Sequence, residues 1–434
     1  MKVKASVLAL GFMAFTSSNV MAEDAPASSQ SIGEQAAVTQ TGDRNRATVD
    51  QQASSYDAVS VFQSSNGAVA KVTSKAGGGN WTSIVQTALP DAGGQSASTA
   101  TVTQDRAFDT KNAVLQVGDN HQAAVTQSDA KDDSSRIGQV GAGNTATITQ
   151  TRTSGNFVGI DQGTSRSAGQ VSGARAEVME TETVGNGVQI SQGLSNGYAY
   201  VEINRFGGNN IAIQQTGGST DARVYHSAET GDIINIYQSG TESAVVHANN
   251  GGYNRTNISQ VGAGEFNVAF VNQDNAFSNR VSIGQTGFGS NVAYVFQVDG
   301  ESNAHTLVNQ GGWMNRLTSL QDGGNNNALR SIQTGTNNVA NFTQTTSSSS
   351  TFGSLQDGTS NSVTASQSGF EESLLLSQNG TSNNVESIQS GSGNRAYLNQ
   401  LGTSNIASVN QVGTGNFAAV SQSGSANSVI VKQR

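Results

Sequence analysis

The chain has 434 residues, a formal net charge of −9, and charged side chains at only 12% of positions, about half the share of an average globular domain. This thinly spread negative charge argues against nucleic acid as a partner, because such a partner requires a clustered basic patch. There is no cysteine, which excludes disulfides and thiol chemistry. Glutamine, asparagine, serine, threonine and glycine supply the polarity instead. Disordered segments share this composition, so only periodicity can indicate an ordered fold.

The first 22 residues predict a secretory signal peptide. Met1, Lys2 and Lys4 give a basic start, residues 5–15 are mostly apolar, and residues 20–22 offer the small side chains that a signal peptidase reads. The apolar stretch is well short of the roughly 20 residues that a membrane-spanning helix needs. We therefore expect cleavage before Glu23, export of residues 23–434 and no transmembrane segment.

Copies of one frame, Q-x-G-x-x-N-x-A-x-V-x-Q, begin soon after this segment. Residues 40–51 match it, as do residues 139–150, so that the region 30–150 carries the frame in part. Between residues 151 and 250 the frame decays and lacks regular asparagine and glutamine. From Gln260 the copies return, at first with spacings of twelve or thirteen residues, so that the region 260–434 is again regular. Because no linker-like composition separates these regions, we predict one continuous repeat domain over residues 23–434 with a degenerate middle.

The C-terminal copies are the most regular. Their glutamines stand eleven residues apart without a break, the same glycine position recurs in each interval, and the same asparagine position recurs in most of them. We predict that the glutamines and asparagines form amide ladders and that the glycines form turns. The glutamines are Gln356, Gln367, Gln378, Gln389, Gln400, Gln411, Gln422 and Gln433; the asparagines are Asn394, Asn405, Asn416 and Asn427; the turn glycines are Gly391, Gly402, Gly413 and Gly424.

Each unit predicts one strand and one turn. Residues 405–411 alternate with the period of two that places one set of side chains on one face of a strand of about seven residues. Residues 412–415 must then reverse the chain, and Gly413 allows the positive φ that such a turn needs. Two units make a coil of about 22 residues. The length therefore predicts an all-β, amyloid-like β-solenoid of roughly 18 coils with two strands each.

Stacking explains the choice of residues. When coils stack about 4.8 Å apart, identical positions fall into columns. Alanine and valine columns would fill a dry interior, while asparagine and glutamine columns would satisfy one another along the stack. Arg395, Tyr397 and Asn399 are expected to point outward. The apolar run at residues 429–431 resembles an open strand edge rather than a cap.

The unit resembles the curlin repeat, whose pattern is a serine-rich half that ends in glutamine, followed by glycine, asparagine, alanine and a closing glutamine. Residues 354–358 and 387–391 show this approach to glutamine, and the resemblance covers most of residues 30–434. It implies a secreted subunit that polymerises with itself into curli-type amyloid fibres for extracellular matrix, biofilm formation and adhesion. It also implies a nucleator subunit and an outer-membrane secretion pore as partners, and no cofactor or metal.

A parallel β-helix enzyme that degrades polysaccharides is an alternative, because its coils are of similar length. Catalysis would require converging carboxylates or bases. The four histidines lie at different repeat positions and are expected to be solvated, and the pairs 132–133 and 371–372 should point to opposite faces of a strand. We therefore predict that the chain is not an enzyme. The histidines are His121, His226, His247 and His305.

Three kinds of non-polymerising solenoid are further alternatives. A calcium-binding solenoid needs G-G-x-G-x-D repeats, which do not follow the pairs at residues 251–252 and 323–324. An ice-binding solenoid needs ranked T-x-T columns, and residues 99–103 and 145–149 only hint at them. A solenoid adhesin would differ only in having capped ends. Trp81 and Trp313 are expected to be turn or outward residues rather than platforms for carbohydrate.

Overall fold

The computed structural model describes residues 33–88, 97–163, 173–193, 196–262, 266–287, 289–299 and 304–434. These residues form 34 strands and no helix. Accordingly, this part of the chain offers no helix that is long and apolar enough to cross a membrane. The predicted signal peptide and its cleavage point lie outside the described residues.

The strands form two parallel sheets according to whether their number is odd or even. The odd sheet contains β1 (Gln35–Thr41), β3 (Ala58–Ser64), β5 (Trp81–Thr87), β7 (Lys111–Asp119), β9 (Ser134–Ala142), β11 (Phe157–Gln162), β13 (Gly187–Gln192), β15 (Asn210–Gln215), β17 (Ile233–Ser239), β19 (Arg255–Gly262), β21 (Arg280–Gly287), β23 (His305–Trp313), β25 (Ala328–Thr336), β27 (Thr351–Thr359), β29 (Ser373–Thr381), β31 (Arg395–Thr403) and β33 (Phe417–Ser425).

The even sheet contains β2 (Arg46–Gln52), β4 (Val69–Lys75), β6 (Thr99–Asp105), β8 (Gln122–Ser128), β10 (Thr145–Thr151), β12 (Arg175–Val184), β14 (Tyr198–Gly207), β16 (Asp221–Ser227), β18 (Glu242–Asn249), β20 (Asn267–Asp274), β22 (Val292–Val298), β24 (Arg316–Asn325), β26 (Val339–Ser348), β28 (Ser362–Phe370), β30 (Asn384–Ser392), β32 (Ile406–Thr414) and β34 (Ser428–Gln433).

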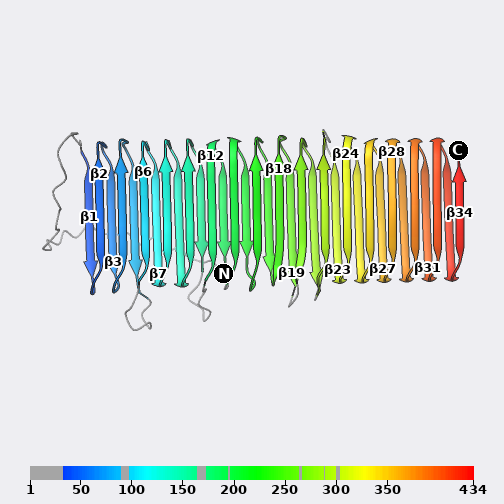
Figure 1. Cartoon of the computed structure of the whole chain (residues 1–434), viewed down its shortest axis with the longest axis horizontal. Helices are drawn as coiled ribbons and strands as arrows, with labels where there is room; N and C mark the ends of the chain where they lie inside the picture. Colours follow the sequence, from blue (N-terminus) through cyan, green and yellow to red (C-terminus); the bar gives the residue numbers. More distant parts are fainter. Residues whose placement is uncertain are drawn as a thin grey trace, which may run out of the picture. The chain divides into compact units, whose positions relative to one another are not determined.

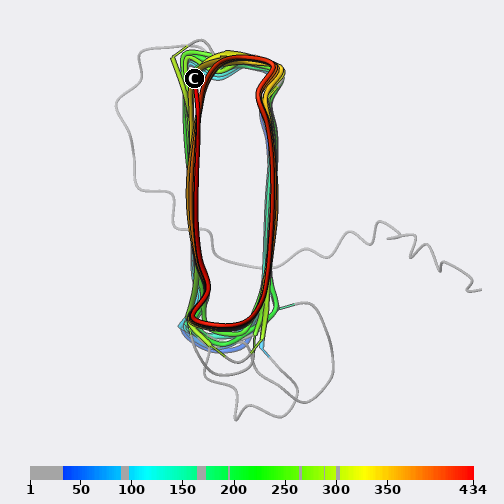
Figure 2. The ribbon, with the colours of Figure 1, turned by 90° about the vertical axis from the view of Figure 1, so that its right-hand side faces the viewer.

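Successive strands alternate between the sheets, so that each pair of strands closes one coil (Figure 1). Viewed along the stack, the coils superimpose as a narrow outline with two long sides and two short corners (Figure 2). The all-β solenoid with two strands per coil is thus confirmed. The described residues form 17 such coils rather than the predicted 18. The reason is that the coil step, 22 residues near the C-terminus, reaches 30 at two earlier positions.

Strands near the C-terminus are longer than predicted because they continue past the glycine corner. The expected strand ended at Gln411, whereas β32 runs to Thr414 and keeps Gly413 paired with Gly391 of the preceding coil. The predicted positive φ is present, at 129° for Gly391 and 108° for Gly413. The chain therefore bends at this glycine without leaving the ladder of backbone pairs.

Alternation buries one face of each strand. In the middle of the solenoid the even sheet contributes small pairs such as Ala199 and Val201, while the odd sheet contributes larger pairs such as Ile211 and Ile213. Small side chains on one sheet thus leave room for large ones on the other, as a close-packed interior requires. Strands β11 to β18, which carry the degenerate part of the sequence, belong to the same two sheets.

Gly391 and Gly393 belong to one turn and both have positive φ, but only Gly391 is also in close contact with the next coil. Gly391 has no space for a side chain, since an added Cβ would meet the backbone of Gly413 in the next coil, whereas a Cβ on Gly393 (φ 69°) would meet nothing within 4 Å. We expect Gly393→Ala to cost about 1–2 kcal/mol through left-handed strain alone. Gly391→Ala should cost clearly more, because the coils must also separate. Urea midpoints of the two variants would test this, and equal midpoints would contradict it.

Candidate functional site

A continuous ladder of glutamines runs along the odd sheet, and all of its members except the first, Gln40, are buried. In each coil the Nε2 of one glutamine donates to the Oε1 of the glutamine in the next coil, at 2.6–3.0 Å. Its members are Gln40, Gln63, Gln86, Gln116, Gln139, Gln162, Gln192, Gln215, Gln238, Gln260, Gln285, Gln310, Gln333, Gln356, Gln378, Gln400 and Gln422.

The even sheet carries a second ladder that is interrupted. It links Gln104, Gln127 and Gln150, and it resumes from Gln273 through Gln297, Gln321, Gln344, Gln367, Gln389 and Gln411 to Gln433. Between these two parts the column holds Glu180, Ile203, His226 and Ala248. The expectation that residues 151–250 lack regular glutamine is therefore right for the even sheet and wrong for the odd sheet. The missed glutamines lie 30 or 23 residues apart, not at multiples of eleven.

From Gln63 to Gln422, each glutamine of the odd ladder also joins the two sheets. The Nε2 of Gln400 donates to the Gln422 side chain at 2.8 Å and to the backbone oxygen of Asn384, on the facing sheet, at 3.1 Å. Gln411 does the same with Gln433 and the backbone of Arg395. Both amide hydrogens are thereby satisfied in an interior where an unpaired polar group costs about 1–3 kcal/mol.

The asparagine columns hold the corners. Asn405 donates from its backbone N–H to Oδ1 of Asn383 and from Nδ2 to the backbone oxygens of Leu401 and Gly424. Asn394 makes the same contacts but uses the carboxylate of Glu372 in place of an asparagine. Asn416 and Asn427 belong to the last coil and are partly or fully exposed.

The turn glycines lie next to these amides. Gly402 accepts from Asn383, Gly413 accepts from Asn394, and Gly424 accepts from Asn405, each through its backbone oxygen at 3.0 Å. Gly391 lies at the equivalent corner, where it is paired with Gly369 and Gly413. Asparagine and glycine therefore act together to set the bend between strands.

The expectation that all four histidines are solvated is wrong for two of them. His121 is buried because it occupies an asparagine column, where its Nδ1 accepts from the backbone N–H of Asn144. His226 is buried because it occupies the even glutamine column. His247 is half-buried and His305 is exposed.

The acidic pairs also lie at corners rather than within strands. Asp132 and Glu371 adopt positive φ, whereas Asp133 and Glu372 are buried in the asparagine column of the odd sheet. The two members of each pair do point in different directions, as expected. The two tryptophans behave as predicted: Trp81 and Trp313 are each 45% exposed at the ends of strands.

Glu180 is the residue that ends the first part of the even ladder. One of its oxygens accepts from Gln150 at 2.8 Å, and the other has no hydrogen-bond partner among the described residues. Burial raises the pKa of Glu180 to about 8. At neutral pH this position therefore favours a protonated acid, which resembles the neutral amide that fills the column elsewhere.

In-register parallel strands closed by two amide ladders define this chain as a β-solenoid repeat protein of the amyloid-like kind. The family model of the curlin associated repeat matches residues 402–434, which comprise most of the last two coils. The C-terminal repeats are thus of the curlin type, and the fold fits a curli-type fibre subunit, a structural rather than a catalytic class of protein. No curated protein matches the chain.

The C-terminal part of the odd ladder can be removed without changing a turn. Replacing Gln378, Gln400 and Gln422 with alanine deletes three neighbouring members of that ladder, whereas a set that includes Gln411 would disturb both ladders. Each loss leaves buried polar groups unpaired, at a cost of about 1–3 kcal/mol. We therefore expect the variant to add to preformed fibre fragments at least tenfold more slowly than the wild type. Alanine at the exposed Asn379 and Asn399 is the matched control. Equal rates for both variants would show that the amides do not drive stacking.

Glu180→Gln should remove a pH dependence of stability. The raised pKa means that the folded state holds a proton that the unfolded chain has lost above about pH 4.5, so stability falls as the pH rises toward 8. At pH 7 the cost of the wild-type acid is about 3 kcal/mol. Hydrogen-exchange protection of β12, corrected for intrinsic exchange rates, should therefore be higher in the variant at pH 7 and equal at pH 4. Glu386→Gln, on the exposed face of β30, should change neither value.

Proposed function

We propose that this chain is a secreted fibre subunit that polymerises by stacking the last coil of one copy on the first coil of the next. The observation that carries the proposal is the match between these two coils. Under the register of the solenoid, β33 would lie over β1, and β34 over β2. In that arrangement five positions of β33 would each lie over an identical residue of β1. These pairs are Ala418 over Ala36, Ala419 over Ala37, Val420 over Val38, Gln422 over Gln40 and Gly424 over Gly42.

The second strand of the junction adds further complementarity. Asn427 would stack on Asn45, Val431 on Val49 and Gln433 on Gln51. On the outer face Lys432 would lie beside Asp50, which pairs opposite charges across the junction. The contact between copies would therefore repeat the contact between coils, with one added charge pair.

The last coil offers free backbone groups for this contact. The N–H of Ile406 donates forward to Asn427, and strand alternation then directs the N–H groups of Ser428, Ile430 and Lys432 away from β32. Ile430 is 68% exposed. An uncapped strand edge of this kind is a template for pairing with another chain.

The setting of the fibre follows from the resemblance and from the curlin repeat at residues 402–434. We propose that the chain leaves the cell through an outer-membrane pore and that a nucleator subunit seeds it at the cell surface. The fibre would then serve extracellular matrix, biofilm formation and adhesion. Residues 1–22, with their signal-peptide pattern, support export.

Capping the last coil tests the polarity of assembly. Ala419→Pro with Ile430→Pro removes one forward-directed N–H from each sheet, and proline is tolerated where the N–H faces solvent. Wild-type protein should form fibres with reflections near 4.7 and 10 Å. The proline variant should not elongate, and in substoichiometric amounts it should stop wild-type growth, because its first coil can still add to a growing end.

The matched control is Ala419→Thr with Ile430→Thr, which keeps both N–H groups and should elongate normally. Assembly of the proline variant at the control rate would refute end-to-end stacking. Wild-type protein that keeps stable β-structure but stays monomeric for days at tens of micromolar would instead identify a non-polymerising adhesin.

A further inference from the structure

The corner between β16 and β17 departs from the repeat at three positions at once. His226 replaces the glutamine of the even ladder, and Asp232 replaces the asparagine of the odd sheet. Glu229 lies between them at a corner position that is small in most other coils, although the adjoining coil has the exposed Phe206 there. The residue that follows this position pairs with its counterpart in the next coil through an isolated β-bridge, and these bridges align the coils. The residues equivalent to Glu229 by this alignment are Ser54, Gly77, Ala107, Ala130, Thr153, Thr183, Gly251 and Ala276.

The local backbone brings these three side chains together. Ala228 and Gly231 adopt positive φ on either side of Glu229 and turn its side chain into the interior. The next residue in the even column is Ala248, whose side chain is far shorter than the usual glutamine. The corner therefore accommodates a buried glutamate where most other corners hold serine, threonine, alanine or glycine.

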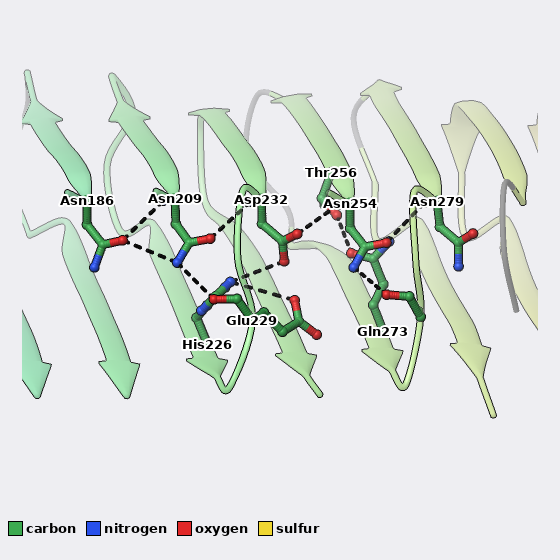
Figure 3. Close-up of polar contacts among 10 residues, drawn as sticks. Asn186, Asn209, His226, Glu229, Asp232, Asn254, Thr256, Gln273 and Asn279 are labelled. Atoms are coloured by element: carbon green, nitrogen blue, oxygen red, sulfur yellow. Dashed lines mark hydrogen bonds and ion pairs between the residues drawn. The ribbon is translucent and has the colours of Figure 1, made fainter. Parts of the chain in front are cut away.

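The geometry of the three groups fits a small cation (Figure 3). Nε2 of His226 lies 3.1 Å from Oδ2 of Asp232 and 3.6 Å from Oε2 of Glu229, and one ligand atom from each residue lies within 4.8 Å of the other two. All three side chains are buried. Tetrahedral zinc with bonds of 2.0–2.2 Å separates its ligands by about 3.3 Å, which lies between these 3.1 Å and 3.6 Å separations.

Glu229 differs from the other buried carboxylates because both of its oxygens are unpartnered, whereas Glu180 and Glu242 each leave one oxygen without a hydrogen bond among the described residues. Neither carboxyl oxygen of Glu229 has a hydrogen-bond partner among the described residues, and neither has Nδ1 of His226. By contrast, Asp57 and Asp133 each accept from a hydroxyl, of Ser74 and Thr153 respectively, and also from a backbone N–H. Those two corners are complete without a further ligand, whereas the corner at Glu229 is not.

Neighbouring coils already hold Asp232 in place. Its backbone N–H donates to Asn209 at 3.0 Å, and its Oδ1 accepts from the backbone N–H of Asn254 at 2.7 Å, which leaves Oδ2 directed at His226. A second layer of contacts that orients one ligand is a usual part of a metal site.

We infer that His226, Glu229 and Asp232 bind one divalent cation of the zinc class. Imidazole with two carboxylates suits zinc and related transition metals, whereas calcium and magnesium require six or more oxygen ligands or several waters. Because the three groups are buried, the ion enters as the corner folds. It ties β16 to β17 in the part of the stack where the even glutamine ladder is interrupted.

The repeat itself supplies variants that should still fold. His226→Gln, Glu229→Ala and Asp232→Asn each restore a residue that other coils carry at the same position. The full chain is unfolded in denaturant with a chelator, refolded with zinc chloride, and freed of loose metal by gel filtration. Mass spectrometry of the elements should then find about one zinc per wild-type chain and at least tenfold less in each variant.

Two controls and one spectrum complete the experiment. Asp133→Asn and His247→Gln, made elsewhere in the stack, should keep the zinc of the wild type. Cobalt(II) refolded into the wild type should show visible bands of a four-coordinate site, and His226→Gln should lose them. Circular dichroism confirms that each variant is folded. Equal zinc in all variants would mark surface binding, and a folded wild type without zinc would refute the site; either result overturns the inference.

Discussion

The parallel, in-register pairing of each strand with the equivalent strand of the next coil governs everything else in this structure. It brings identical repeat positions into columns, and it leaves a buried amide with one abundant partner, another amide directly above or below. The odd glutamine ladder obeys this constraint from Gln40 to Gln422. Corner glycines obey it too, since at Gly391 a side chain would collide with the adjacent coil. Composition, turn chemistry and interior packing are thus consequences of one spacing.

The two sheets share this constraint unequally. The odd sheet keeps every glutamine, while the even sheet replaces four in succession with Glu180, Ile203, His226 and Ala248. One complete ladder, together with backbone pairs and an interior of isoleucine, valine and alanine, keeps β11 to β18 in the same stack. The interrupted column buries two ionisable side chains, Glu180 and His226. These departures from the repeat are tolerated because the opposite sheet preserves the register.

A solenoid of this type makes no physical distinction between its own next coil and the first coil of another copy. The groups that β32 uses to hold β34 are of the same kind as those that β34 leaves at its outer edge. In the proposed fibre, adding a copy would therefore repeat the contacts between coils, with the charge pair of Lys432 and Asp50 in addition. Specificity comes from register: a slip of one residue would expose the valines and bury Lys432 or Asp50.

The sequence alone determined the solenoid, its two strands per coil, the glycine corners, and the amide columns of the last coils, because each follows from the spacing of residues close together in the chain. It did not reveal that the odd ladder crosses the degenerate middle, since coils of 30, 23 and 25 residues hide the alignment of their glutamines. Nor did it reveal that His121 and His226 are buried, or that Glu229 lies beside His226 and Asp232. Membership of a column depends on which residues the stacked coils place above one another, and inserted corner residues change that without changing the strands. Only the tertiary structure decides it.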